Sequence, residues 1–126
     1  MKNLFLLLLI FFIGVSCANE VRLNRVHGVK GEFYPILLEE GIKFHINAPE
    51  ATLVTIAGSF NGWNPYATEL EKNKDGVWSI ILPLRAGTRY YYKYLIDGFW
   101  LADPDNPNTV PDGYGGVNSE IFFPVE

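Results

Sequence analysis

Three tryptophans are the residues of this sequence with the most binding chemistry to offer. Trp63 lies in a Gly- and Asn-rich loop at residues 59–65, and Trp100 follows a tight turn by two residues. Large aromatic side chains near loops and turns are candidates for a binding face. Trp78 instead alternates in phase with the apolar residues of a strand, which predicts that it packs in the core.

The chemistry that Trp63 and Trp100 suggest is the binding of a sugar. A glucose ring has faces made of C–H groups and edges made of hydroxyls. A flat indole stacks on the faces, whereas Asn, Lys and backbone groups hydrogen-bond the edges. Such binding needs no metal or cofactor. Plainer roles stay open, with Trp63 as a lid over the end of the fold and Trp100 as a cross-strand partner of a tyrosine.

The elements expected to position these residues are β-strands throughout. From Gly31 onward, short alternating or β-branched segments are separated by clusters of Gly, Pro, Asn and Asp, and no window shows a helical apolar stripe. This pattern predicts an all-β fold, an immunoglobulin-like antiparallel β-sandwich, over residues 31–126. The expected strands are 33–38 (at best an edge strand, because it contains a proline), 41–47, 52–57, 77–82, 89–96, 99–101 and 120–124.

Alternation within two of these strands assigns faces. In the strand at 41–47 the apolar residues alternate with polar ones, which places His45 on the polar face. In the strand at 89–96, Tyr92 and Tyr94 are out of phase with Lys93 and are expected in the core.

The end of the tyrosine-rich strand and the segment after it are rich in turn residues. Asp97 and Gly98 predict a two-residue hairpin turn that needs positive φ. Residues 102–119 show no regular pattern, and a long irregular loop in a small domain is often functional.

Residues 1–30 are typical of an export signal followed by a tether. Residues 4–13 form an unbroken apolar run, which is too short to span a bilayer as a helix but suits a signal-peptide core. The sequence GVSC that follows resembles a bacterial lipoprotein signal, in which Cys17 becomes the lipidated N-terminus. The alternative is ordinary cleavage near Ala18 and secretion. We expect a signal peptide at 1–16, a tether at 17–30 and an exported protein anchored by lipid at the cell envelope.

Charge and cysteine content argue against several other classes of protein. The formal net charge is −4, whereas a nucleic-acid-binding surface is basic. Cys17 is the only cysteine, so no disulfide can form within the chain and the fold must rest on its core. His27 and His45 are too isolated in the sequence to suggest a metal site or a catalytic triad.

Several short motifs follow one another in a fixed order from residue 58 onward. Residues 58–63 read GSFNGW, 84–87 read LRAG, 92–100 read YKYLIDGFW, 103–104 read DP and 116–119 read GVNS. In this order and spacing they resemble the motifs of family 48 carbohydrate-binding modules. That family includes the glycogen-binding domain of the AMP-activated protein kinase beta subunit and the N-terminal sandwich of isoamylases and branching enzymes. The resemblance covers roughly Gly41 to Phe123.

The resemblance implies a set of sugar-binding residues. Trp63 and Trp100 match the two tryptophans that stack on sugar in the family. Lys93 matches the lysine that bonds sugar hydroxyls from the adjacent strand. Asn118 matches the asparagine that bonds the sugar from the last loop.

Other positions depart from the pattern or allow plainer roles. Tyr114 falls where the kinase-subunit domain has a leucine that inserts into the helical glucan, so a tyrosine there could also contact sugar. Gly116 falls where that domain has a threonine, so one side-chain contact is absent. Lys93 could be a solvated strand residue, and Asn118 could bond its own loop. Asn61 is expected to order its turn rather than touch sugar.

These features predict a non-catalytic protein that binds α-glucan. Glycoside hydrolysis needs two carboxylates placed across the scissile bond. Asp97 is used by the hairpin turn, and Asp103, Asp105 and Asp112 lie in the long loop, where we do not expect a rigid pair. Relatives that cleave glucans use a separate (β/α)₈ barrel, which we do not expect here.

The expected partners follow from the same prediction. They are glycogen, starch or malto-oligosaccharides, the membrane through the lipid anchor, and envelope enzymes that process glucans. No cofactor, metal or nucleic acid is expected. The alternative is a protein-interaction or structural β-sandwich with weak or lost sugar binding.

Overall fold

The computed structural model describes residues 31–126. The predicted signal peptide, the tether and Cys17 lie outside the described residues. Among residues 31–126 there is no helix long and apolar enough to cross a membrane.

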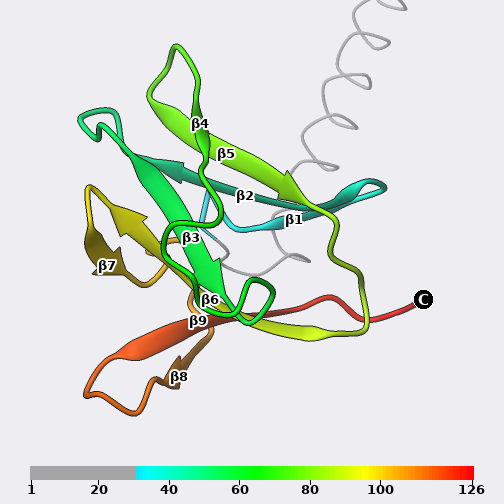
Figure 1. Cartoon of the computed structure of the whole chain (residues 1–126). Helices are drawn as coiled ribbons and strands as arrows, with labels where there is room; N and C mark the ends of the chain where they lie inside the picture. Colours follow the sequence, from blue (N-terminus) through cyan, green and yellow to red (C-terminus); the bar gives the residue numbers. More distant parts are fainter. Residues whose placement is uncertain (1–30) are drawn as a thin grey trace, which may run out of the picture. The chain divides into compact units, whose positions relative to one another are not determined.

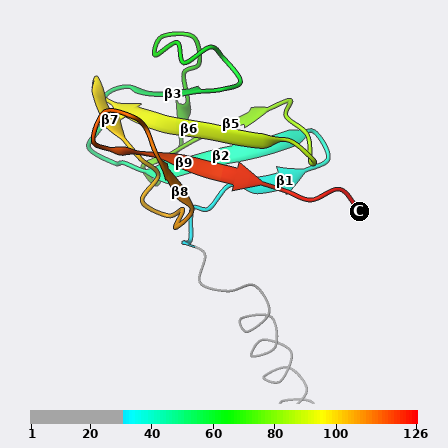
Figure 2. The same cartoon turned by 90° about the horizontal axis from the view of Figure 1, so that it is seen from below.

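Nine β-strands make up the described part of the chain. They are β1 (Ile36–Leu38), β2 (Gly41–Asn47), β3 (Val54–Gly58), β4 (Glu71–Lys72), β5 (Val77–Leu82), β6 (Arg89–Ile96), β7 (Phe99–Leu101), β8 (Thr109–Pro111) and β9 (Val117–Phe122). One sheet has the order β1-β2-β5-β4 and the other the order β3-β6-β9-β8, while β7 pairs with β6 off this path (Figure 1). All pairs are antiparallel, and Figure 2 shows the two sheets as packed layers. This arrangement confirms the predicted all-β, immunoglobulin-like sandwich.

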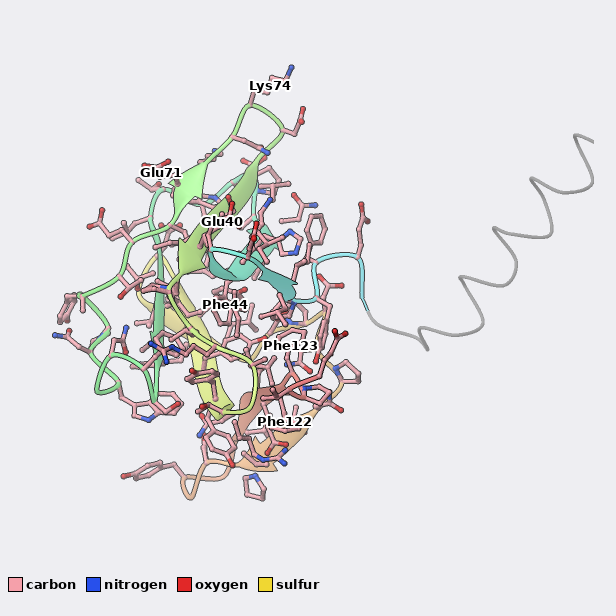
Figure 3. All side chains as sticks on the ribbon, turned by 90° about the vertical axis from the view of Figure 1, so that its right-hand side faces the viewer. Glu40, Phe44, Glu71, Lys74, Phe122 and Phe123 are labelled. Carbon is pink, nitrogen blue, oxygen red and sulfur yellow. The ribbon has the colours of Figure 1, made fainter. Side chains whose placement is uncertain are left out.

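The core between the sheets is built from the inward side chains of the longest strands. Phe44 of β2 and Tyr92 and Tyr94 of β6 are fully buried, and the ring centroids of Phe44 and Tyr92 are 4.9 Å apart in an edge-on contact. Figure 3 shows Phe44 in the interior, between the layers. Trp78 is also buried, and its indole Nε1 donates a hydrogen bond to the carbonyl of Ala48 at 2.9 Å. The core positions predicted for the two tyrosines and Trp78 are therefore confirmed.

The hairpin turn between β6 and β7 has the predicted geometry and an additional role. Asp97 and Gly98 have φ values of 49° and 83°, as a two-residue turn of this class requires. The Asp97 carboxylate also accepts hydrogen bonds from the backbone N–H groups of Thr52 and Leu53, at 2.9 and 2.8 Å from Oδ1. One side chain thus ties the hairpin to the segment that leads into β3.

His45 alternates with the core residues Phe44 and Ile46, as predicted for the polar face of β2, but it is buried. Only 9% of it is exposed. Its Nε2 donates to the carbonyl of Tyr34 at 3.0 Å, and the ring of Phe33 packs edge-on against it with centroids 5.5 Å apart. The segment before β1 packs over this face of β2 through Phe33 and Tyr34. Alternation within a strand shows which face a residue is on, but not whether another segment covers that face.

The least regular parts of the sequence differ most from the prediction. The strand expected at 52–57 is observed at Val54–Gly58, and the one expected at 120–124 is observed at Val117–Phe122. Residues 102–119 are not one irregular loop, because β8 and the start of β9 form a hairpin within them. The strand β8 is three residues long and contains a proline, so it has no alternation to detect.

Candidate functional site

An open groove of about 690 Å³ gathers the side chains that the sequence analysis had singled out for binding. The side chains that line it come from four separate segments of the second sheet and its loops. They are Trp63, Lys93, Trp100, Asp112, Tyr114 and Asn118. The structure thus brings all five predicted residues together, with one addition, Asp112. Their contact with sugar stays a prediction.

Strand register places three of these residues on the outer face of the sheet. Successive residues of a strand point to opposite faces, so Lys93 points outward between the buried Tyr92 and Tyr94. Ser119 of β9 pairs with Tyr92 and is fully buried, and its neighbour Asn118 therefore points outward as Lys93 does.

Trp100 reaches the same face from the hairpin. It pairs with Leu95 of β6, which is in phase with Lys93. Its cross-strand partner is therefore a leucine, which contradicts the alternative role as partner of a tyrosine. Half of Trp100 is exposed, so part of the indole is available to a ligand.

The loop that carries Trp63 is held by the side chain of Asn61. Its Oδ1 accepts from the backbone N–H of Gly58 at 3.0 Å, and its Nδ2 donates to the carbonyl of Ile56 at 2.9 Å and to Thr68 Oγ1 at 3.1 Å. This confirms that Asn61 orders its turn. Trp63 itself has a φ of 58°, a left-handed conformation that costs a non-glycine residue roughly 1–2 kcal/mol. The Asn61 bonds, together with a bond from the N–H of Trp63 to the Gly58 carbonyl at 3.0 Å, hold the turn in this conformation.

Asp112 is the groove residue that the sequence analysis missed. Its Oδ2 accepts a hydrogen bond from Lys93 Nζ at 2.7 Å, and its Oδ1 accepts from the backbone N–H groups of Tyr114 and Gly116 at 2.7 and 3.0 Å. The bond from Lys93, followed by that from Tyr114, lowers the pKa of Asp112 to about 2. The pattern Asp-Gly-x-Gly-Gly at residues 112–116 indicates that Asp112 orders a turn, because an aspartate commonly accepts a hydrogen bond from the backbone N–H two residues further on.

The contacts of Lys93 and Asn118 decide between the roles left open for them. The side chain of Lys93 is only 15% exposed and is paired with Asp112, so Lys93 is not simply a solvated residue. The side chain of Asn118 makes no hydrogen bond to any other residue within 31–126, so it does not bond its own loop there and its amide is open to the groove.

A second polar cluster lies inside the fold, beneath the long loop. Tyr92 Oη donates to Asp103 Oδ2 at 2.6 Å, and Asn106 Nδ2 donates to Tyr92 Oη at 3.1 Å and to the Glu120 carbonyl at 3.0 Å. Burial raises the pKa of Asp103 to about 6. These contacts attach Asp103 and Asn106 to β6 and β9, so this part of the segment is held by the fold and Asp103 has a structural role.

The described residues offer no site for a metal ion. No group of three or more His, Cys, Asp or Glu side chains within residues 31–126 has the arrangement to hold one. The groove itself is lined by three aromatic side chains, one amide and one ion-paired ammonium.

Comparison with known proteins agrees with the motifs and the fold. Residues 31–115 match carbohydrate-binding module 48, the isoamylase N-terminal domain. The chain is 37% identical over 67 residues to 1,4-alpha-glucan branching enzyme GlgB 2 of Xanthomonas campestris pv. campestris (strain 8004), covering 50% of this chain and 9% of that protein. It is 38% identical over 64 residues to Protein PTST homolog 2, chloroplastic, of Arabidopsis thaliana, covering 51% and 12%.

A third relative shows the same pattern of partial coverage. It is the 1,4-alpha-glucan branching enzyme GlgB of Cupriavidus pinatubonensis, 34% identical over 74 residues, covering 58% of this chain and 9% of the enzyme. The chain thus spans about a tenth of the length of these relatives. Because the family match extends over most of residues 31–126, the chain belongs to the carbohydrate-binding module 48 (isoamylase N-terminal domain) family.

Proposed function

We propose that this protein binds α-glucan, as glycogen, starch or malto-oligosaccharide, in the groove on its second sheet. The observation that carries the proposal is the convergence of three aromatic side chains, an ammonium and an amide in one open groove. Membership of a carbohydrate-binding family supports a sugar ligand. The names of the branching enzymes, which act on 1,4-alpha-glucan, support the α-linked class.

The aromatic residues would bind the apolar faces of the glucose rings. Trp63 lies in the loop after β3 and Trp100 in β7, but both line the same groove, so successive sugars along one chain could stack on them. Tyr114 is 95% exposed and could contact the same chain from the β8–β9 turn. Lys93 and Asn118 line the same groove. They would donate hydrogen bonds to the sugar hydroxyls, and the Asn118 amide oxygen would also accept them. An open groove that contacts few sugars gives weak binding per site.

We further propose that the domain catalyses no reaction on the glucan. Hydrolysis requires two carboxyl groups across the bond, but the groove lining contains a single carboxylate, Asp112. That carboxylate is already ion-paired and has a lowered pKa, which makes it a poor proton donor.

The place of action that we propose is the cell envelope, with the domain anchored by lipid at Cys17. The support is the sequence alone, an apolar run followed by the GVSC motif. In this setting the protein would hold glucan chains close to envelope enzymes that process them.

Affinity electrophoresis tests the glucan proposal directly. We expect the wild-type protein to be retarded in gels that contain glycogen and not in gels that contain a β-glucan. The double variant Trp63→Ala/Trp100→Ala should lose at least roughly tenfold in affinity, because it loses two stacking contacts. Tyr66→Ala is the matched control, since Tyr66 lies in the same loop as Trp63, is 85% exposed and does not line the groove.

Circular dichroism on the same samples separates loss of binding from loss of folding. Equal retardation of the double variant and the wild type would rule out the groove as the site. No retardation of the wild type by either polymer would favour the protein-interaction alternative. The exposed apolar side chains Phe99 and Leu101 of β7 would then be the first surface to test.

A further inference from the structure

The two charged side chains of the groove neutralise each other. Lys93 Nζ lies 2.7 Å from Asp112 Oδ2, and the two side chains are only 15% and 10% exposed. Both come from residues that line the groove, and its other lining residues are uncharged. An ammonium group has three donors. One is taken by Asp112, which leaves two for the oxygen atoms of a ligand.

The same carboxylate fixes the turn between β8 and β9. Asp112 Oδ1 accepts from the N–H groups of Tyr114 and Gly116, and the N–H of Asp112 donates to the Gly116 carbonyl at 3.1 Å. Gly113 and Gly115 have φ values of 85° and 89°, which a glycine adopts without strain. Tyr114 is almost fully exposed, so its position depends on this turn and not on packing.

The ion pair has a consequence for the charge of the ligand. A largely buried lysine without a partner attracts phosphate and other anions, which form strong charge-assisted hydrogen bonds with it. With Asp112 in place, an anion at Lys93 would lie a few ångströms from a carboxylate, and like charges at that distance repel each other. A neutral hydroxyl meets no such repulsion and can accept from Lys93. The lowered pKa of Asp112, about 2, keeps the carboxylate charged at neutral pH.

We propose that Asp112 is a positioning and specificity-determining residue of the groove. It aims Lys93, fixes the turn that carries Tyr114, and makes the groove select neutral saccharides over phosphorylated ones. This inference rests on the proposed sugar binding and adds the charge of the saccharide that the groove accepts.

The variant Asp112→Asn separates the charge from the shape of the turn. Its amide oxygen can still accept from the N–H groups of the turn, but its negative charge is lost. The two ligands are a malto-oligosaccharide and the same oligosaccharide carrying one phosphate, measured by titration calorimetry. We expect Asp112→Asn to improve the affinity for the phosphorylated ligand, relative to the neutral one, by roughly tenfold. A change of this size corresponds to about one charge-assisted hydrogen bond.

Two further variants identify the source of the shift. Asp75→Asn makes the same change in net charge on the β4–β5 turn of the other sheet, where Asp75 is exposed, and should leave the ratio unchanged. The double variant Asp112→Asn/Lys93→Met should lose the improved affinity for the phosphorylated ligand, because that improvement depends on the unpaired ammonium of Lys93. If Asp112 only stabilised the fold, Asp112→Asn would weaken the binding of both ligands equally and would not improve the relative affinity for the phosphorylated one.

An unchanged ratio in Asp112→Asn, or an equal shift in Asp75→Asn, would overturn the inference. Failure of the proposed function gives a different result, in which the wild-type protein binds neither ligand. In that case a gain for the phosphorylated ligand in Asp112→Asn would still support the neutralising role of Asp112, and its absence would overturn it.

Discussion

At the scale of single residues, the surroundings of two aspartates on either side of β8 give them opposite properties. Asp103 is 3% exposed, and burial raises its pKa to about 6. Asp112 faces the groove beside Lys93, and that pairing lowers its pKa to about 2. The residue type is the same in both places. Desolvation determines the first pKa, and the hydrogen bond from Lys93 is the main cause of the second.

The raised pKa of Asp103 predicts how stability depends on pH. The folded state binds the Asp103 proton more tightly than an unfolded chain does, so ionisation of this group destabilises the fold. We expect its contribution to the free energy of unfolding to fall by on the order of 2 kcal/mol as the pH rises from about 4 to about 6. Asp103→Asn, which cannot ionise, should flatten this part of the pH profile.

Urea denaturation at several pH values between 4 and 7 measures the effect, and Asp112 stays ionised throughout that range. Asp75→Asn, at an exposed position, should keep the wild-type slope. If Asp103→Asn retained that slope as well, the pH dependence would come from another group.

At the scale of elements, hydrogen bonds between short polar side chains and backbone groups determine where the binding residues lie. Asn61 orders the loop that carries Trp63, Asp112 orders the turn that carries Tyr114, and Asp97 ties the Trp100 hairpin to the start of β3. Each of the three aromatic side chains thus lies in a loop, hairpin or turn that a side chain of its own segment stabilises. Such preorganisation lowers the entropy lost when a ligand binds.

This arrangement predicts that removal of Asn61 weakens binding although Asn61 touches no ligand. Asn61→Ala loses three hydrogen bonds that hold the loop, so Trp63 is no longer kept at its positive φ. We expect affinity for glycogen to fall about as far as in Trp63→Ala, and the free energy of unfolding to fall by about 1–3 kcal/mol. Affinity electrophoresis and urea denaturation measure the two effects.

Asn64→Ala is the control for that experiment. Asn64 lies in the same loop, but its side chain accepts a single exposed bond, from the N–H of Tyr66 at 2.9 Å. Wild-type affinity in Asn61→Ala would show that Trp63 finds its position without the Asn61 bonds.

At the scale of the whole molecule, the proposed anchor would set where the groove meets its ligand. An anchored domain binds long glucan chains at the surface of a membrane, and many copies side by side would hold one polymer more firmly than a single weak site. This advantage applies to a polymer that several domains can reach at once. It does not apply to a short oligosaccharide, which occupies one groove.

The anchor is tested by Cys17→Ser in a bacterial host that processes lipoproteins. The wild-type chain should incorporate labelled fatty acid and sediment with the membrane fraction, because acyl chains on Cys17 would partition into the bilayer. The variant should do neither, while its binding to glycogen stays unchanged. Wild-type protein recovered without label in the soluble exported fraction would instead support cleavage near Ala18 and secretion.

Much of the fold could be read from local patterns in the sequence. The bounds of β5, β6 and β7 were predicted correctly, because alternation, a closing proline and the Asp97-Gly98 turn are all features of neighbouring residues. The same holds for the core positions of Tyr92 and Tyr94. Strand β8 could not be predicted, because it exists only through its pairing with β9.

The candidate site divides in the same way. The sequence by itself determined that the chain forms strands, which residues carry binding chemistry, and that four of them match one family's motifs. Only the tertiary structure decided that Asp112 pairs with Lys93, nineteen residues away, and that the segment before β1 covers His45. Residue type and periodicity are local properties of the chain. Burial and ion pairing depend instead on segments that meet only when the two sheets and their loops have folded.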